Sequence, residues 1–105
     1  MKLRPYEAAD LETYIWVCNH ANPARPTTEA QVTHSDASLE PAAIRARFLV
    51  FEAGALIGAI NLEPPRSNPI PGEVRLQLLL LAEFVDRADS LYEAAERAAI
   101  ATGVV

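Results

Sequence analysis

The chain is most constrained by two apolar segments that are joined by the dipeptide Ala53-Gly54. Residues 48–52 and 55–62 are rich in branched and aromatic side chains, and a glycine between two such segments supplies the tight turn of a β-hairpin. Gly58 lies inside the second segment, where a glycine indicates a bulge or the close approach of another backbone. Because a hairpin cannot bury its own faces, other segments of the chain must cover it.

Two further strands are predicted around this hairpin. Residues 2–6 form a short strand, in which Pro5 is best placed on an edge or at the strand's end. Residues 73–81 form another strand after the proline-rich loop 64–72. This strand first alternates apolar and polar residues and then ends in four leucines, 78–81, which indicates that helices cover its second half on both faces.

Two helices are predicted between the first strand and the hairpin. Apolar residues recur at helical spacing over 11–19, and Asp10 is the expected N-cap of that helix. A second helix starts at Thr27 or Thr28. Thr28 and Gln31 have the spacing of a capping box, in which each side chain accepts a hydrogen bond from the backbone amide of the other residue.

A last helix is predicted over 89–102, with Asp89 or Ser90 as its N-cap and Gly103 as its stop. Residues 104–105 look like the beginning of another strand. The buried face of the helix has mostly small side chains, so the helix can approach a sheet closely. It consists of Leu91, Ala94, Ala95, Ala98 and Ala99. The expected fold is α/β: a mostly antiparallel sheet with helices on both faces, which ends after the fourth strand and the following helix.

Composition limits the class of protein. A chain of 105 residues, half of them hydrophobic, makes one domain over 1–105 with a real core. The only cysteine, Cys18, excludes an internal disulfide and a cysteine-rich zinc site, which favours the cytoplasm. A net charge of −5 disfavours a nucleic-acid binder, and no apolar run is long enough to span a membrane.

The order of these elements resembles the amino-terminal half of the GNAT fold (GCN5-related N-acetyltransferases). The opening strand and helix cap at 3–11, the hairpin at 52–59 and the segment 91–96 carry this resemblance. It implies acetyl-CoA-dependent transfer of an acetyl group to an amine. In that family, backbone groups of the apolar strand pair with the pantetheine arm, and a glycine-rich loop wraps the pyrophosphate. The resemblance assigns these cofactor roles to Leu79, Leu80, Leu81, Val85, Asp86, Arg87, Ala88, Asp89 and Ser90.

The expected phosphate loop departs from the family pattern. Residues 82–90 contain no glycine, so side chains stand where backbone amides should approach the phosphates. Asp86 and Asp89 add negative charge there. Arg87 has two open interpretations, as a phosphate ligand or as the ion-pair partner of Asp86, Glu83 or Asp89. We therefore expect acetyl-CoA to bind weakly or not at all.

The candidate catalytic residues are Glu63 and Glu73, at strand ends beside the expected acceptor cleft. A strand carboxylate in the family often deprotonates the amine, but either glutamate also suits a solvated loop. No metal site is expected, because His20 and His34 have no carboxylate or cysteine at ligand spacing. Cys18 is expected in the core, and Trp16 on the solvent side of its helix.

The family fold continues with another strand, a helix and a hairpin, and usually takes a tyrosine general acid from that part. This chain is therefore either the amino-terminal piece of a longer protein or a short relative without the active half. Without the next strand, residues 76–81 expose a leucine-rich edge that tends to pair with another strand. We expect a homodimer, or association with a carboxyl-terminal partner domain, through this edge. The alternative function is a non-catalytic GNAT-like module that acts through such association.

Overall fold

The computed structural model describes residues 1–37, 46–63 and 75–101. Its centre is a sheet of four strands in the order β1-β2-β3-β4, and it is antiparallel, as the sequence predicted. The strands are β1 (Lys2–Pro5), β2 (Ala46–Glu52), β3 (Ala55–Glu63) and β4 (Arg75–Leu80). The helices are α1 (Leu11–Ala21), α2 (Glu29–Ala37) and α3 (Ala88–Ala101), with short 3-10 turns η1 (Ala8–Asp10) and η2 (Ala82–Arg87).

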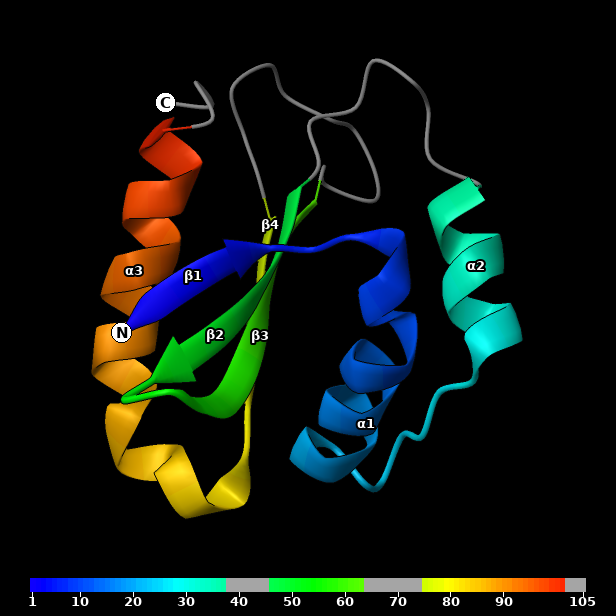
Figure 1. The fold of residues 1–105 in the computed structure, drawn as a ribbon, viewed down its shortest axis with the longest axis horizontal. Coiled ribbons are helices and arrows are strands. Elements are labelled where there is room, and N and C mark those ends of the chain that lie inside the picture. Colours follow the sequence, from blue (N-terminus) through cyan, green and yellow to red (C-terminus); the bar gives the residue numbers. More distant parts are fainter. Residues whose placement is uncertain (38–45, 64–74, 102–105) are drawn as a thin grey trace.

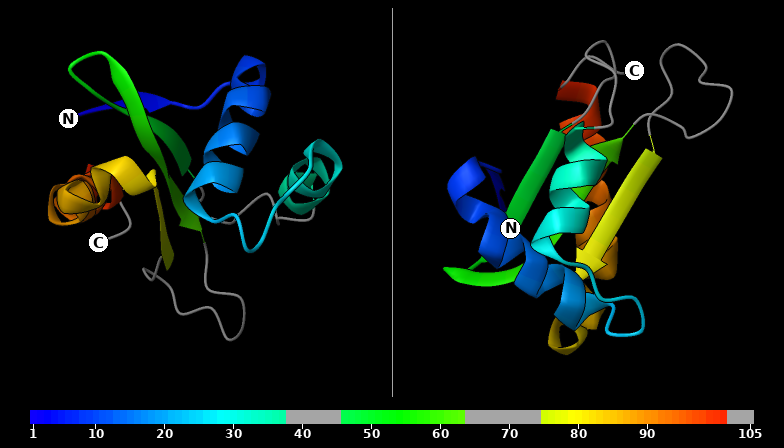
Figure 2. Two further views of the ribbon diagram at one scale, coloured as in Figure 1. Left: turned by 90° about the horizontal axis from the view of Figure 1, so that it is seen from below. Right: turned by 90° about the vertical axis from the view of Figure 1, so that its right-hand side faces the viewer.

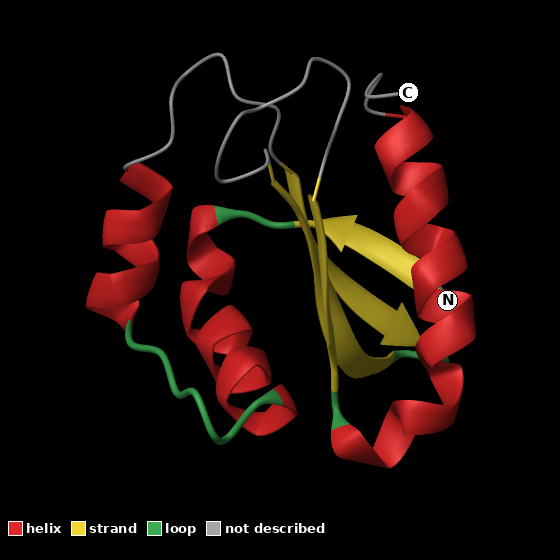
Figure 3. Ribbon diagram, turned by 180° about the vertical axis from the view of Figure 1, so that it is seen from behind, coloured by secondary structure: helices red, strands yellow, loops and turns green. Residues whose placement is uncertain are grey.

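The sheet lies between two helical layers. Figure 1 shows α3 along one face and α1 with α2 on the other, and Figure 3 shows the same layers from behind. In Figure 2, the view from below has the two layers well separated by the strands. The expected α/β architecture with helices on both faces is confirmed. No helix in the described ranges is long and apolar enough to cross a membrane.

The β2–β3 hairpin carries both features that its glycines predict. Ala53 and Gly54 form the turn with φ of 51° and 82°, the left-handed pair that suits a two-residue hairpin. Val50 pairs with Gly58, and the next residue of β2, Phe51, pairs with Leu56. Ile57 is therefore an extra residue in β3 and forms a bulge there. A Cβ added at Gly58 would lie 2.1 Å from the carbonyl oxygen of Leu79 on β4. This glycine therefore permits both a bulge and a close approach of two strands.

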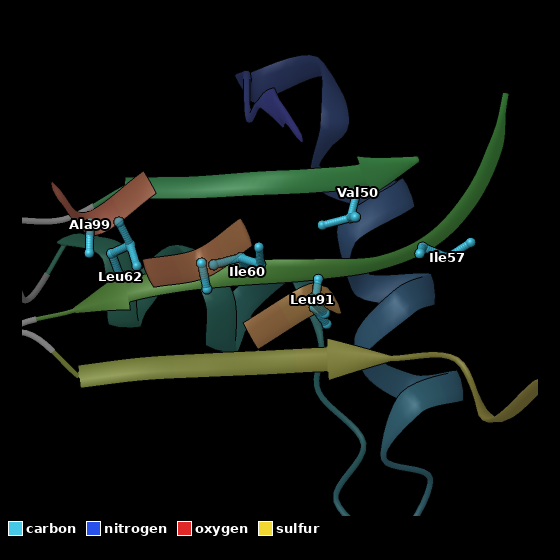
Figure 4. Packing of buried hydrophobic residues seen from close by; sticks show 7 residues of the cluster. Val50, Ile57, Ile60, Leu62, Leu91 and Ala99 are labelled. Carbon is cyan, nitrogen blue, oxygen red and sulfur yellow. The ribbon is translucent and has the colours of Figure 1, made fainter. Parts of the chain in front are cut away.

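Each face of the sheet has its own apolar core. On the α3 face, seen in Figure 4, the buried residues are Val50, Ile57, Ile60, Leu62, Leu91, Ala95 and Ala99. On the opposite face they are Tyr14, Val17, Val32, Leu49, Ala59 and Leu79. The predicted alanine face of α3 is confirmed, since Ala94, Ala95 and Ala99 are buried and Ala98 packs against the same cluster.

Two of the three predicted helix starts are confirmed in position, and one is wrong. Asp10 is the N-cap residue of α1, as predicted, but its carboxylate makes no hydrogen bond to the amides of that helix. It accepts two hydrogen bonds from Arg4, at 2.9 and 3.1 Å, and one from the Glu7 amide, because a guanidinium is the stronger partner. The Thr28–Gln31 capping box is present, with reciprocal bonds of 3.1 and 3.2 Å.

The start of α3 differs more. The helix begins at Ala88 and directly continues η2, so neither Asp89 nor Ser90 is its N-cap. Hydrogen bonds from Phe84 to Leu81 and from Ala88 to Val85 join strand end, turn and helix without an open loop. The expectations for Glu73, for Gly103 and for residues 104–105 lie outside the described residues.

Candidate functional site

A groove of about 410 Å³ follows the outer edge of β4. One wall is the carboxyl end of α1, the floor is the strand itself, and the other wall is the junction of η2 and α3. The residues that line it are Ala21, Asn22, Gln77, Leu78, Leu79, Leu80, Val85, Ala88 and Leu91. Most of the lining residues are apolar, but polar atoms, including the amide side chains of Gln77 and Asn22, make up nearly half of the exposed lining. Its shape suits an extended ligand lying beside a strand.

The strand residues assigned to a cofactor divide between the groove and the core. Leu79 packs in the core on the α1 face, Leu80 packs against the α3 core, and both reach the groove. Leu81 is buried and does not line it. Its backbone amide donates to the carbonyl oxygen of Ile57 at 2.9 Å, so that amide already has a partner within the sheet.

The residues assigned to the phosphate loop lie on a helical segment. Val85, 71% exposed, and Ala88 line the groove. Asp86, Asp89 and Ser90 are exposed beyond it. The structure thus brings together Leu79, Leu80, Val85 and Ala88, and leaves the other five assigned residues outside the groove lining.

Arg87 forms ion pairs in the structure. Its Nε lies 2.8 Å from Glu52 Oε2 on β2, and one of its terminal nitrogens lies 3.7 Å from Asp86. The pair with Asp86 was among the sequence-based alternatives, whereas the shorter contact joins residues 35 positions apart in the chain. No local charge pattern could have found Glu52, because the contact depends on the end of the hairpin reaching η2.

Glu63 also has a partner. Arg75, its cross-strand neighbour on β4, donates to Glu63 Oε2 at 2.6 Å. The side chains are 24% and 39% exposed, so this pair stands at the surface at the far end of the strands from η2. The other candidate base, Glu73, is outside the described residues.

A row of polar side chains that the sequence did not single out crosses the α1 face of the sheet. Arg47, Asn61 and Gln77 are direct neighbours on β2, β3 and β4. Arg47 Nε donates to Asn61 Oδ1 at 2.7 Å, and Asn61 Nδ2 donates to Gln77 Oε1 at 3.1 Å. The second proton of Asn61 Nδ2 goes to the Tyr14 hydroxyl at 2.7 Å. The signal in the sequence was Asn61, a polar residue between Ile60 and Leu62 in an apolar strand.

The aromatic and thiol groups around this row are held in their neutral forms. Burial raises the pKa of Tyr14 to about 12, although the nearby Arg47 charge opposes the shift. Burial also raises the pKa of the Cys18 thiol, which fits a half-buried structural residue rather than a nucleophile. Among the described residues, no group of three or more histidine, cysteine or acidic side chains is arranged to hold a metal.

The Arg47 guanidinium packs against two tyrosine rings. Its Cζ is 4.0 Å from the ring centre of Tyr14 and 4.8 Å from that of Tyr6. Such cation–π contacts hold a partly desolvated arginine in one orientation. On the solvent side of α1, Trp16 is 46% exposed as expected and stacks on His20, with ring centres 4.1 Å apart.

Comparison with solved structures finds a tandem GNAT protein from the clavulanic acid biosynthesis pathway, solved without acetyl-CoA. The TM-score is 0.67 and the sequence identity 26%, over 93% of this chain and 32% of that chain. This chain therefore spans about a third of the length of the protein that it matches. Neither the protein-family models nor the curated proteins give a match. On the strength of the structural match and its antiparallel α/β architecture, the chain has a partial GNAT-like fold.

Proposed function

We propose that this chain is a GNAT-type acetyltransferase module whose β4 groove receives the acyl-pantetheine arm of acetyl-CoA. The observation that carries the proposal is the groove itself, which lies between β4 and the start of α3 in a GNAT-like fold. Its apolar walls suit the carbon chain of pantetheine. The outer edge of β4, which has no strand partner among the described residues, offers backbone groups to the amides of that arm.

The nucleotide end of the cofactor gains little from this site. The backbone amides of Phe84 and Ala88 are bonded within η2 and cannot turn toward a pyrophosphate. Exposed carboxylates at Glu83, Asp86 and Asp89 would repel it. We therefore expect weak binding of acetyl-CoA, governed by the arm, and no acetyl transfer by this chain alone.

The test compares acetyl-CoA with acetyl-pantetheine, which has the same arm without phosphates. Amide chemical shifts of groove residues such as Leu79, Leu80 and Ala88 report binding. We expect both ligands to shift them with dissociation constants within about threefold of each other. If neither ligand shifts them, the proposed groove is wrong. If acetyl-CoA binds tenfold more tightly and Arg87→Ala abolishes that advantage, the phosphate end is a real subsite.

Catalysis is tested separately. A thiol-release assay with a panel of amines should give no turnover above the uncatalysed rate. The described candidate base, Glu63, is engaged by Arg75, whose guanidinium already occupies one of its carboxylate oxygens. Turnover that is lost in Glu63→Gln or Glu73→Gln would contradict this expectation.

A second candidate function is a non-catalytic module that associates through β4. The favouring observation is the outer edge of that strand, which pairs with no other strand in the described ranges and where Leu76, Leu78 and Leu80 are only half-buried. A second copy of the chain, or a carboxyl-terminal partner domain, would pair with this edge and exclude water from it. Sedimentation equilibrium discriminates, since a module of this kind is dimeric with or without acetyl-pantetheine.

A further inference from the structure

The polar row on the α1 face has a fixed direction. The Arg47 guanidinium has only donors, so the Asn61 atom that it contacts must be the amide oxygen. The Asn61 nitrogen then faces Gln77, and Gln77 must present its oxygen to it. Because an amide carries its nitrogen on the other side of the same carbon, Gln77 Nε2 is turned away from Asn61. Chemistry alone thus sets the orientation of both amides.

This arrangement is also rigid at its buried end. Asn61 is 1% exposed, and all three of its polar contacts, to Arg47, Tyr14 and Gln77, are made. Reversing Asn61 would set its nitrogen against the Arg47 donor, and would leave its oxygen facing Gln77 and the hydroxyl of Tyr14. The side-chain amide of Asn61 therefore keeps one orientation, and its hydrogen bond to Gln77 sets the orientation of the Gln77 amide as well.

The outward end of the row reaches the groove. Gln77 is exposed, lies on the last strand of the sheet and lines the groove along β4. We infer that the Arg47–Asn61–Gln77 row positions the Gln77 Nε2 protons as donors to a carbonyl oxygen of the ligand in that groove. Gln77 is the binding residue, and Arg47 and Asn61 are positioning residues.

The ligand oxygen is the thioester carbonyl, an assignment that rests on the proposed function. In the orientation that the GNAT-like fold implies, the nucleotide end leaves the groove beside η2 and an extended arm runs back along β4 toward Gln77. The distance from Leu81 to Gln77 along a strand is roughly 14 Å. The acyl end of the arm therefore comes to lie beside the Gln77 amide, while the apolar walls formed by Ala21 and Leu79 contact its carbon chain.

The first experiment uses two ligands that differ at one group. Acetyl-pantetheine has the thioester carbonyl, and S-ethyl-pantetheine has a methylene in its place. The wild-type chain should bind acetyl-pantetheine about fivefold more tightly, the gain of one hydrogen bond. Gln77→Glu keeps an oxygen to accept from Asn61 but presents no donor, so its preference should vanish or reverse. Gln77→Met, which has neither amide group, is the matched control and should also lose the preference.

The second experiment needs no ligand. In Asn61→Asp, the carboxylate still accepts from Arg47 but cannot donate to Gln77. The Gln77 amide should then turn over and donate inward. Proton exchange at its side-chain NH₂ group, followed by NMR, should change from fast at both protons in wild type to protected at one proton in the variant. The preference for acetyl-pantetheine should fall with it.

The outcomes separate this inference from the proposed function. If both pantetheine ligands bind wild type equally, or if the preference survives Gln77→Glu, the donor role is wrong while the groove stands. If neither ligand binds, the proposed function and the assigned thioester oxygen both fall, and the exchange data alone decide the row's direction. A protected Gln77 NH₂ group in wild type would overturn that direction. Should Asn61→Asp fail to fold, Gln77→Glu carries the decision.

Discussion

Gly58→Ala should be among the most damaging small changes in this chain. The new Cβ would stand 2.1 Å from the Leu79 carbonyl oxygen and 3.3 Å from Leu80 Cα, both backbone atoms of the adjacent strand. Since backbone in a ladder cannot step aside alone, β3 and β4 must separate by about 1 Å. That movement stretches the bond from the Leu81 amide to the Ile57 carbonyl, which is 2.9 Å long.

The cost follows from these contacts. Overpacking of this kind costs about 1–3 kcal/mol, and weakening one or two buried hydrogen bonds adds about 1 kcal/mol each. We expect a loss of roughly 2–5 kcal/mol in the free energy of unfolding. The free energy of unfolding of a domain of this size is about 5–15 kcal/mol, so the variant should still fold but unfold at a lower urea concentration than the wild type.

Gly54→Ala is the matched control. Gly54 has φ of 82° but nothing within 4 Å of an added Cβ, so its substitution costs only backbone strain, about 1 kcal/mol. Urea unfolding followed by circular dichroism measures both variants. If Gly58→Ala proves no more destabilising than Gly54→Ala, the close approach of β3 and β4 does not constrain this sheet and the reasoning is refuted.

Three further predictions concern the α1 face, the first turn and the β4 edge. Tyr14→Phe should cost about 1–3 kcal/mol in urea unfolding, because it leaves a buried Asn61 N–H without an acceptor. Because the pKa of Tyr14 is raised to about 12, the neutral Tyr14 hydroxyl contributes its full stability to the wild-type fold below about pH 10, and this contribution is lost as the pH rises through about 12. The pH profile of Tyr14→Phe should lack this loss. The hydrogen bonds from Arg4 hold the pKa of Asp10 below its ordinary 3.8, so this pair should stabilise the fold above that pH and stop doing so as the pH falls through the lowered pKa. NMR titration should find the Asp10 pKa higher in Arg4→Ala, and an unchanged value would contradict the assignment. Leu80→Lys should shift any dimer toward monomer in sedimentation equilibrium, with circular dichroism as the control for folding, whereas a wild-type chain that is monomeric at high micromolar concentration would exclude the β4 interface.

The fold was predictable because each element has a local cause. The Ala53-Gly54 turn, the four leucines at 78–81 and the alanine face of α3 each limit the backbone to one kind of structure. What the sequence could not reveal was the competition between partners. Asp10 stands at the N-cap position of α1, but its carboxylate accepts hydrogen bonds from Arg4 instead of from the amides of that helix, because β1 pairs with β2 and brings Arg4 beside it. Such choices depend on tertiary contacts that no single segment contains.

The candidate site was predictable only in part. The apolar pattern of residues 78–81 predicted a strand that is covered on both faces, whereas the cofactor roles of Leu79 and Leu80 came from the family resemblance. The polar row was missed because its members are 14 and 16 residues apart and become neighbours only through strand register. A simple rule would have found its centre: an asparagine inside an apolar strand needs hydrogen-bond partners, which stand on the adjacent strands or on the helix that covers them.

The misassigned start of α3 and the weak phosphate binding that we propose for the groove have one physical cause. A phosphate cradle needs backbone amides that point out of the chain, and a helical turn uses the same amides for its own hydrogen bonds. Residues 82–88 contain no glycine or proline to stop a helix, so the turn η2 forms directly after β4 and runs into α3. The amides of Phe84 and Ala88 are thereby committed within the turn. The residues that let the helix start at Ala88 are the same ones that commit these amides, which is why we propose that a ligand in this groove is held by its acyl arm and not by its nucleotide end.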